Sequence, residues 1–343
     1  MNLLVTGGAG FIGSNFVRYW TEKFPEDRIT VLDAFTYAGS IDNLPPGAYE
    51  DLCGTLRVWY GNVCNAELVD SLVEDADVVV HFAAETHVTR SIFDNMQFFH
   101  TDVIGTQTVA NAIVKAGDRV KLFLHISTSE VYGTALDAAM DEDHPLNPMS
   151  PYAAAKCGAD RLVYSYWKTY GLPAVIVRPF NNYGPRQHLE KVVPRFVTSV
   201  ILGEDITVHG DGSAARDFIH VDDTCRALDA IINAPSEKVV GDVFNLASGE
   251  HRSIAEIAQA MVEEMDCDPA KIKFIGDRPG QVFRHTGDST KILDRLGWKP
   301  IVPWSEGLRS TIDWFQNNRP WWEKQIWLRR IPIKTKSGKV EFH

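Results

Sequence analysis

The sequence predicts an α/β protein built on a doubly wound parallel sheet, with a smaller α/β lobe toward the C-terminus. In the first half of the 343-residue chain, short runs of Val, Ile and Leu alternate with segments of helix length. Such runs are typical of strands buried on both faces of a sheet. A glycine-rich turn follows the first run directly, and the alternation becomes less regular after about residue 179. The length also favours roughly two domains.

The first half supplies the strands of the sheet and the helices that cross over between them. The expected strands are residues 3–6, 29–32, 56–60, 77–81, 120–127 and 174–178. The expected helices are residues 12–23, 98–115 and 151–170. Because each helix separates two buried strands, the strands should pair in parallel.

The second half is expected to divide between the sheet and the smaller lobe. Its expected helices are residues 192–202, 220–234, 253–265 and 305–317, and its expected strands are residues 205–209 and 243–246. We therefore predict a first domain of residues 1–179 with about 218–247, and a second lobe of about 180–217 with 248–325. The basic tail, residues 326–343, has no clear period and should form an ordered or flexible surface arm.

Composition and charge exclude several classes of protein. Hydrophobic residues make up 45% and charged residues 23% of the chain, which is ordinary for a globular protein. No apolar run is long enough to span a membrane, and the N-terminus lacks a signal peptide's basic and apolar regions. The net charge of −11 argues against nucleic-acid binding. The five cysteines lack metal-site or disulfide spacing, so we expect no metal and a cytoplasmic protein.

The glycine-rich turn predicts a dinucleotide site. Gly7, Gly10 and Gly13 are spaced G-x-x-G-x-x-G between the first strand and the first helix. Glycines there let the backbone approach a pyrophosphate, which then lies at the positive end of the helix. This context identifies the first domain as a Rossmann-type domain, whereas the spacing alone would also fit an ordinary turn. Asp33 follows the second strand, where a carboxylate accepts ribose hydroxyls and disfavours a 2′-phosphate, so NAD is expected rather than NADP.

A second group of residues predicts acid–base chemistry. Tyr152 and Lys156 are four residues apart and should project from one face of a helix. The lysine charge would lower the pKa of the phenol, which could then act as a base. The fifth strand ends in Ser127-Thr128-Ser129-Glu130, at the edge where doubly wound sheets bind their ligands. A surface Tyr and Lys on an amphipathic helix would give the same spacing.

Together these features resemble the extended short-chain dehydrogenase/reductase family, and within it the nucleotide-sugar 4,6-dehydratases, above all the dTDP-glucose enzymes. The resemblance covers about residues 1–322. It is carried further by the stretches 33–39, 83–91, 181–185, 190–191, 216–218, 277–280 and 321–322. It implies a homodimer formed by the helices expected at 98–115 and 151–170, with Leu162, Tyr166 and Tyr170 in one apolar stripe.

The resemblance also assigns roles to residues. It implies catalytic roles for Thr128, Ser129, Glu130, Tyr152 and Lys156. It implies that NAD is bound by Gly7, Gly10, Phe11, Ile12, Gly13, Asp33, Ala34, Thr36, Asn62, Val63, Ala83, Ala84, Tyr152 and Lys156. It implies that the nucleotide diphosphate sugar is bound by His87, Thr128, Asn181, Glu190, Lys191, Arg216 and Asn245.

In the implied reaction Tyr152 takes the proton of the sugar 4-hydroxyl while the C4 hydride passes to NAD. Lys156 holds the nicotinamide ribose, and Thr128 positions the 4-oxygen. Glu130 removes the C5 proton, water leaves from C6, and the hydride returns to C6. The product is a 4-keto-6-deoxy sugar. A carboxylate at Glu130 favours a dehydratase over a 4-epimerase, which removes no C5 proton; a Glu at a helix N-terminus is the alternative explanation.

Departures from the dTDP-glucose enzymes leave alternatives open. Ser129 stands where those enzymes carry an Asp that protonates the leaving water, Asn62 where an Asp contacts adenine, and Gln281 in place of a base-pocket His. The best expectation is dTDP-glucose as substrate, and the alternatives are UDP- or GDP-N-acetylglucosamine 4,6-dehydratase, UDP-glucuronate decarboxylase and nucleotide-sugar 4-epimerase. A non-catalytic NAD-sensing module would not need Thr128, Glu130, Tyr152 and Lys156 together.

Overall fold

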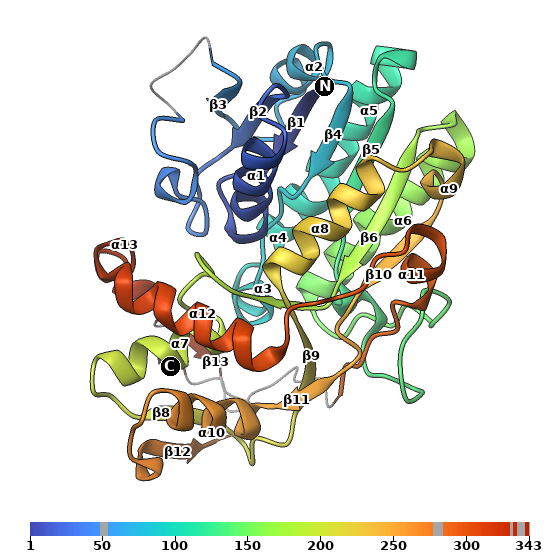
Figure 1. The fold of residues 1–343 in the computed structure, drawn as a ribbon. Helices are drawn as coiled ribbons and strands as arrows, with labels where there is room; N and C mark the ends of the chain where they lie inside the picture. The colour runs from blue at the N-terminus through green and yellow to red at the C-terminus, as the bar shows by residue number, and fades with distance from the viewer. Residues whose placement is uncertain (49–53, 277–283, 330–331, 335–339, 343) are drawn as a thin grey trace.

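The computed structural model describes residues 1–48, 54–276, 284–329, 332–334 and 340–342. Its centre is a seven-stranded sheet in the order β10-β6-β5-β4-β1-β2-β3, with every neighbouring pair parallel (Figure 1). The strands are β1 (Asn2–Thr6), β2 (Arg28–Asp33), β3 (Leu56–Tyr60), β4 (Val78–His81), β5 (Leu122–Ile126), β6 (Ala174–Pro179) and β10 (Val243–Leu246). This arrangement confirms the predicted doubly wound parallel sheet.

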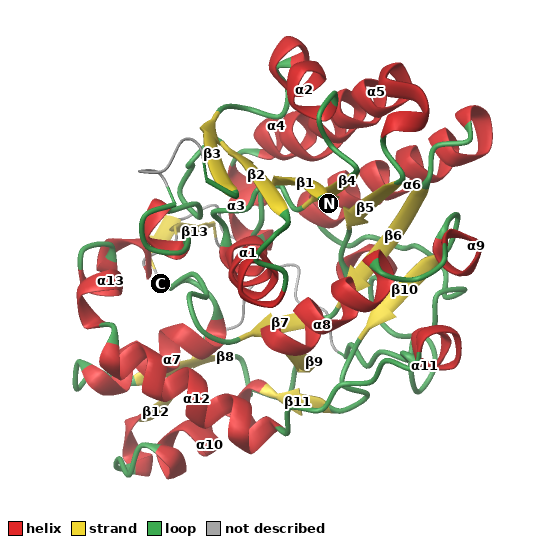
Figure 2. Cartoon of the chain, turned by 45° about the horizontal axis from the view of Figure 1, so that its top comes forward, coloured by secondary structure: helices red, strands yellow, loops and turns green. Residues whose placement is uncertain are grey.

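Helices cover both faces of this sheet and bury its Val, Ile and Leu runs (Figures 1 and 2). One face packs against α1 (Phe11–Lys23), α8 (Val221–Ile232) and α11 (Thr290–Leu296), and the other against α2 (Ala66–Val73), α5 (Thr106–Ala116) and α6 (Pro151–Tyr170). The strand order reverses between β1 and β4, because the chain passes β2 and β3 on one side before it returns. Open α/β sheets bind ligands at such a reversal, outside the carboxyl ends of the strands.

The smaller lobe has its own core below this edge of the sheet (Figure 1). It contains β7 (Asn181–Tyr183), β8 (Ile206–His209), β9 (Ala215–His220), β11 (His251–Ser253), β12 (Ile272–Ile275), α7 (Val192–Ile201), α10 (Ile254–Glu264), α12 (Trp304–Asn317) and α13 (Arg319–Glu323). The remaining elements are α3 (Val88–Phe93), α4 (Asn95–Phe98), α9 (Ser236–Val239), β13 (Pro332–Lys334), β14 (Val340–Phe342) and the short helices η1 (Ile41–Asn43), η2 (Phe99–Gly105), η3 (Gly117–Arg119), η4 (Ser129–Tyr132), η5 (Pro269–Lys271) and η6 (Ile326–Arg329).

The structure differs from the sequence-based expectation in three places. The helix expected at 98–115 is interrupted by η2, a π-helical segment. The turn-rich stretch after residue 180 contains β7, because those residues pair with β9. Part of the basic tail forms the antiparallel strand pair β13 and β14, and β13 lies beside α3.

Some sequence features lie outside the described residues. These are Cys53, the stretch 277–283 with its family-like Asp277-Arg278-Pro279-Gly280 and Gln281, and the tail residues Arg330, Lys336 and Lys339. Within the described ranges, no helix is both long enough and apolar enough to cross a membrane.

Candidate active site

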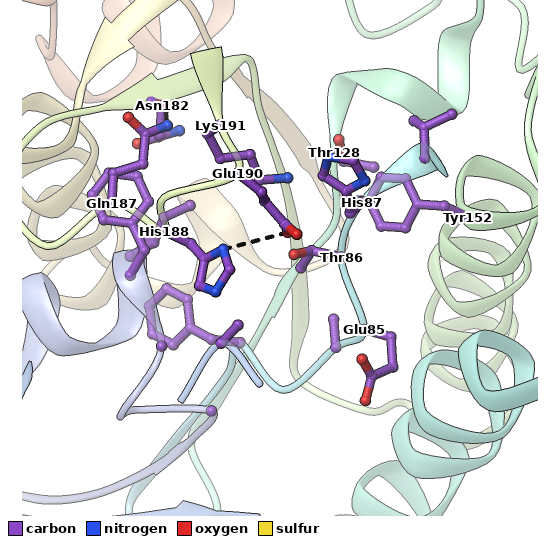
Figure 3. Close-up of a pocket in the computed structure, with 18 of the residues that line it drawn as sticks. Glu85, Thr86, His87, Thr128, Tyr152, Asn182, Gln187, His188, Glu190 and Lys191 are labelled. Carbon is purple, nitrogen blue, oxygen red and sulfur yellow. Dashed lines mark hydrogen bonds and ion pairs between the residues drawn. The ribbon is translucent and has the colours of Figure 1, made fainter. Parts of the chain in front are cut away.

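A cavity of about 470 Å³ lies between the carboxyl edge of the large sheet and the smaller lobe. Figure 3 shows the side chains of Tyr152 and Thr128 on one side of this cavity and those of Gln187 and His188 on the other. The predicted residues that line it are Gly7, Gly10, Phe11, Ile12, Gly13, Asp33, Ala34, Thr36, Asn62, Val63, Ala83, Ala84, His87, Thr128, Glu130, Tyr152, Lys156, Asn181, Glu190, Lys191 and Arg216. Two predicted residues, Ser129 and Asn245, do not line it.

The turn requires glycine at two positions because a side chain there would clash with neighbouring backbone. A Cβ on Gly7, whose φ is +70°, would lie 2.5 Å from the backbone nitrogen of Ala83. A Cβ on Gly13 would clash with the carbonyl oxygen of Gly7. Gly10 is the N-cap of α1 and provides no side-chain cap, so the first amides of α1 are available to an anion. The turn therefore fits the pyrophosphate of a dinucleotide.

Asp33 is held at the adjacent wall of the cavity. Its two carboxylate oxygens accept hydrogen bonds from the backbone nitrogens of Ala9, at 2.9 Å, and Phe35, at 2.8 Å. Burial raises the pKa of Asp33, and these two hydrogen bonds act in the opposite direction. The fixed carboxylate fits ribose hydroxyls and is unfavourable for a phosphate at the same place.

The catalytic side chains come from two neighbouring elements. Thr128 follows β5, and its Oγ1 accepts the backbone N–H of Glu130 at 3.2 Å, which starts the tight helix η4. Tyr152 and Lys156 lie in the first turns of α6, which begins at Pro151 after the N-cap Ser150. The packing of α6 beside the end of β5 brings the phenol, the ammonium and Glu130 to one wall of the cavity.

The ionisation of this group differs from the sequence-based prediction. Burial raises the pKa of Tyr152, the charge of Asp102 raises it further, and a hydrogen bond with Thr128 lowers it. The Lys156 ammonium donates to the carbonyl oxygen of Ile126 at 2.7 Å, and burial lowers its pKa against the charges of Asp102 and Asp160. The expected lowering of the phenol pKa by Lys156 is therefore not seen: burial and the charge of Asp102 raise this pKa, and the hydrogen bond with Thr128 is what lowers it.

Asp102 is an acidic neighbour that the sequence analysis did not identify. It lies in η2, is almost fully buried, and accepts the backbone N–H of Glu85 at 2.7 Å. Burial raises the pKa of Asp102 to about 7, while the charge of Lys156 lowers it. Asp102 lies inside the helix expected at 98–115, where a single acidic residue gives no functional signal, because only the packing of η2 on α6 brings the carboxyl near Lys156.

The opposite wall of the cavity contains a buried ion pair. The Glu190 side chain is fully buried and accepts a hydrogen bond from Nε of Arg90 at 2.8 Å, and its Oε1 lies 3.5 Å from Nδ1 of His188. The Arg90 guanidinium stacks on the ring of Tyr37, 4.1 Å from its centroid, and the Tyr37 hydroxyl donates to the Thr86 carbonyl oxygen. Arg90 and Tyr37 lie in the family-like stretches, but the sequence did not show that they meet Glu190.

Cationic and amide groups from the smaller lobe complete the cavity. Arg216 lies on β9, Lys191 precedes α7, and Asn181 begins β7. His87 lies outside the smaller lobe but also lines the cavity; it has a φ of +112° and is the N-cap of α3. The two cations reach the same cavity as the glycine turn and could neutralise a diphosphate.

Ser129 and Asn245 lie outside the cavity lining. Asn245 accepts the Tyr132 hydroxyl at 2.8 Å and donates to the Met140 carbonyl oxygen at 3.0 Å, so its amide is occupied away from the cavity. The Ser129 hydroxyl is buried and has no hydrogen-bond partner among the described residues. Because Ser129 does not line the cavity, the structure does not bring it to the reacting groups.

A buried network fixes the segment that carries Thr128 and Glu130. Arg178 donates to both oxygens of Asp160, at 2.9 and 3.0 Å, and to the Tyr132 hydroxyl at 2.9 Å. Asp160 also accepts the Ser127 hydroxyl at 2.8 Å. One ion pair therefore holds residues on either side of Thr128 and Glu130.

Comparisons with known proteins agree with this geometry. The sequence profile of the GDP-mannose 4,6-dehydratase family matches residues 4–311. The low-salt glycan biosynthesis protein Agl12 of Haloferax volcanii is 46% identical over 315 residues, which cover 92% of this chain and 98% of that protein. A dTDP-glucose 4,6-dehydratase of Mycobacterium tuberculosis is 42% identical over 326 residues, covering 94% of this chain and 95% of that protein.

Solved structures are similar over the same extent. DesIV of Streptomyces venezuelae, a dTDP-glucose 4,6-dehydratase with NAD and TYD bound, superposes with a TM-score of 0.88 at 40% identity, covering 94% of this chain and 99% of that one. A UDP-glucose 4-epimerase of Thermotoga maritima with UDP-glucose gives a TM-score of 0.85 at 28% identity, covering 93% and 100%. The fold is thus shared by dehydratases and epimerases, and the side chains of the site must decide between them.

Proposed function

The chain belongs to the GDP-mannose 4,6-dehydratase family, and from this premise we propose that it is an NAD-dependent nucleotide-sugar 4,6-dehydratase. NAD is assigned to the domain of residues 1–179 with about 218–247, and the nucleotide sugar to the lobe of about 180–217 with 248–325. dTDP-glucose is the proposed substrate, because relatives with that printed activity cover nearly the whole chain.

The position of Glu130 carries the proposal. It lines the same cavity as Tyr152, Lys156 and Thr128, and its side chain is 19% exposed. The phenol, ammonium and threonine suffice for oxidation at C4, but only a base beside them can remove the proton from C5. A carboxylate at this place favours elimination over simple epimerisation.

Each side chain then has a defined proton to move or group to orient. Bound NAD supplies the hydride acceptor for C4 and the donor for C6, and its positive charge opposes the raised pKa of the phenol. Tyr152 takes the proton of the 4-hydroxyl, Lys156 supports the phenolate, and Thr128 donates to the 4-oxygen. Glu130 takes the C5 proton and, without a carboxylate at Ser129, passes a proton to the departing 6-oxygen. Solvent then reprotonates Glu130 as Tyr152 releases its proton, and Glu130 gives this new proton to C5.

A product assay tests this function against the alternatives. The purified protein is incubated with dTDP-glucose, UDP- and GDP-N-acetylglucosamine and UDP-glucuronate, and the product masses are measured. A product lighter by one water supports the dehydratase. A product lighter by carbon dioxide would identify a decarboxylase, and a product of unchanged mass with inverted configuration at C4 would identify an epimerase. Tyr152→Phe is the inactive control. Dinucleotide binding without turnover of any sugar nucleotide would leave an NAD-sensing module as the better assignment.

We also propose that the protein is a homodimer. Large apolar side chains are exposed along α3 to α6, namely Phe93, Met96, Phe99, Ile104, Val114, Tyr164 and Tyr170. In the predicted stripe only Tyr170 is fully exposed, because Tyr166 packs partly against the core and donates to Asn111 at 2.7 Å. A second copy would cover this face. Light scattering at micromolar concentration should give twice the chain mass, and a monomer mass would contradict the proposal.

A cytoplasmic location is part of the same proposal. Cys64, Cys157, Cys225 and Cys267 are free thiols in the structure. Unpaired cysteines of this number suit a reducing compartment. Cell fractionation tests the location.

A further inference from the structure

A buried histidine, His285, lies close to the Glu130 carboxylate. His285 is fully buried, and its Nδ1 lies 3.9 Å from Oε1 of Glu130. Its Nε2 hydrogen-bonds the carbonyl oxygen of Gly133, the residue that ends η4. Glu130 and Gly133 belong to one tight turn, because the Gly133 N–H donates to the Glu130 carbonyl oxygen at 3.2 Å. The imidazole thus contacts both ends of the turn that carries the proposed base.

The backbone around His285 is anchored on two sides, so its ring position is fixed. The His285 N–H donates to the Ala215 carbonyl oxygen at 3.1 Å on β9. On the other side, the Thr286 carbonyl oxygen accepts from Met140 at 2.8 Å. Gly133 itself has a φ of +73°, and a Cβ there would clash with the Asn147 carbonyl oxygen. Such support from both sides is what holds a functional side chain in a defined geometry.

The hydrogen bond to Gly133 fixes the tautomer of His285. A carbonyl oxygen only accepts, so Nε2 must carry the hydrogen. Burial lowers the pKa of His285; the charge of Glu130 opposes this, and Arg216 and His144 act in the same direction as burial. The ring is therefore neutral near pH 7 and presents the lone pair of Nδ1 to Glu130. Nδ1 has no hydrogen-bond partner among the described residues.

We infer that His285 is a positioning residue for Glu130, whose proton-bearing carboxyl donates a hydrogen bond to Nδ1. This rests on the proposed function, in which Glu130 takes the C5 proton. The C5–H bond breaks, its electron pair enters the enolate of the 4-ketone, and the proton forms an O–H bond on Glu130. Rotation about the last side-chain torsion of Glu130, which is broad for a carboxyl group, turns this O–H between the sugar and Nδ1.

Glu130 must keep this proton on its own carboxyl, because Ser129 supplies no second acid. The proton that Glu130 takes must stay on its carboxyl until the 6-oxygen departs. The lone pair of Nδ1 can accept a hydrogen bond from this O–H and so hold the carboxyl in place until the 6-oxygen departs. The present separation of 3.9 Å is longer than a hydrogen bond, and the partly exposed Glu130 side chain can close it by a small rotation.

The first test reads the tautomer and needs no substrate. Protein labelled with ¹⁵N-histidine is examined by NMR, and the signal of His285 is assigned as the one lost in His285→Phe. A neutral ring protonated on Nε2 near pH 7 supports the inference, and a proton on Nδ1 overturns it. Because no sugar is present, this result stands even if the wild type turns over none of the sugar nucleotides, which would defeat only the proposed function.

The second test separates two steps of turnover. His285→Gln keeps an amide donor for the Gly133 carbonyl but has no acceptor at the place of Nδ1. With dTDP-glucose, exchange of solvent deuterium into C5 should fall about tenfold, the usual effect of one hydrogen bond. Oxidation at C4, followed by the near-ultraviolet absorbance of reduced cofactor, should stay near the wild-type rate.

His251→Gln is the matched control. His251 is exposed, and its Nδ1 hydrogen-bonds Thr286 at 2.9 Å, so it touches the same segment without facing Glu130. Both steps should stay near wild type in this variant. If His285→Gln slows both steps by one factor, or leaves C5 exchange unchanged, the histidine is a packing residue and the inference is wrong.

Discussion

Removal of the Arg178 guanidinium should destabilise the fold strongly. The side chains of Arg178 and Asp160 are 2% and 0% exposed, and two hydrogen bonds of 2.9 and 3.0 Å join them. Arg178→Met has similar volume but leaves the carboxylate of Asp160 buried without its main partner. Breaking one side of a buried ion pair costs about 3–5 kcal/mol, so the free energy of unfolding should fall by about that amount.

A neighbouring arginine provides the control for this experiment. Arg161 also contacts Asp160, with Nε 2.9 Å from Oδ1, but its side chain is 41% exposed. Arg161→Met should therefore cost at most about 1 kcal/mol, as exposed ion pairs do. Urea unfolding of both variants and the wild type, followed by circular dichroism, measures the difference. If both variants lost the same free energy of unfolding, the argument that burial makes Arg178 the more important partner of Asp160 would be refuted.

The pH dependence of the same variants gives a second check. In the wild type, burial would raise the pKa of Asp160, but its hydrogen bond and charge interaction with Arg178 lower it below the ordinary value. The carboxylate therefore stabilises the fold above its unfolded pKa of about 3.9, and this contribution is lost as the pH falls further. In Arg178→Met burial is the dominant effect on Asp160, so the contribution of its carboxyl to stability grows as the pH falls. The difference in free energy of unfolding between wild type and variant should therefore become smaller toward pH 4. A difference that becomes larger there would contradict the assignment.

Three further outcomes concern the site. Glu130→Gln should retain C4 oxidation in part but lose elimination by about 10²–10⁴-fold, so that reduced cofactor accumulates and little deuterium enters C5; turnover near the wild-type rate would favour an epimerase. As the control for this variant, Tyr152→Phe should accumulate no reduced cofactor and take up no deuterium at C5. Cofactor extracted from the purified protein should be NAD, because Asp33 opposes a 2′-phosphate; finding NADP would overturn that role. Gly13→Val should abolish dinucleotide binding measured by calorimetry while the fold, measured by circular dichroism, persists, since its Cβ would clash with the Gly7 carbonyl oxygen.

Local sequence patterns were sufficient for the sheet, the dinucleotide turn and the Tyr152/Lys156 pair, whereas the family resemblance assigned most of the other cavity residues. Buried runs such as Val78–His81 are apolar throughout, because a central parallel strand has no solvent face. Gly7 and Gly13 could be assigned from spacing, because only glycine permits the backbone approach that the turn requires. Tyr152 and Lys156 were found in the same way, since helix geometry fixes their relative direction.

Contacts between distant segments could not be found from such patterns. The resemblance assigned Asn245 to the substrate, but this residue lies within β10 and its amide is taken up by Tyr132 and Met140. The residues of β7 are turn formers and became a strand only because β9 offers a partner. The raised pKa of Tyr152 could not be predicted either, because it comes from burial and from the charge of Asp102, which depend on how η2 packs against α6.

The sequence by itself determined the fold class, the dinucleotide turn and the residue types of the reacting group. These depend on backbone geometry and on periodicity over a few residues, which any short segment carries within itself. The tertiary structure alone decided which charges face one another: Arg90 with Glu190, Asp102 with Lys156, and His285 beneath Glu130. The two members of each pair lie on different elements, and electrostatic interaction depends on separation in space and on burial, neither of which is a property of position along the chain.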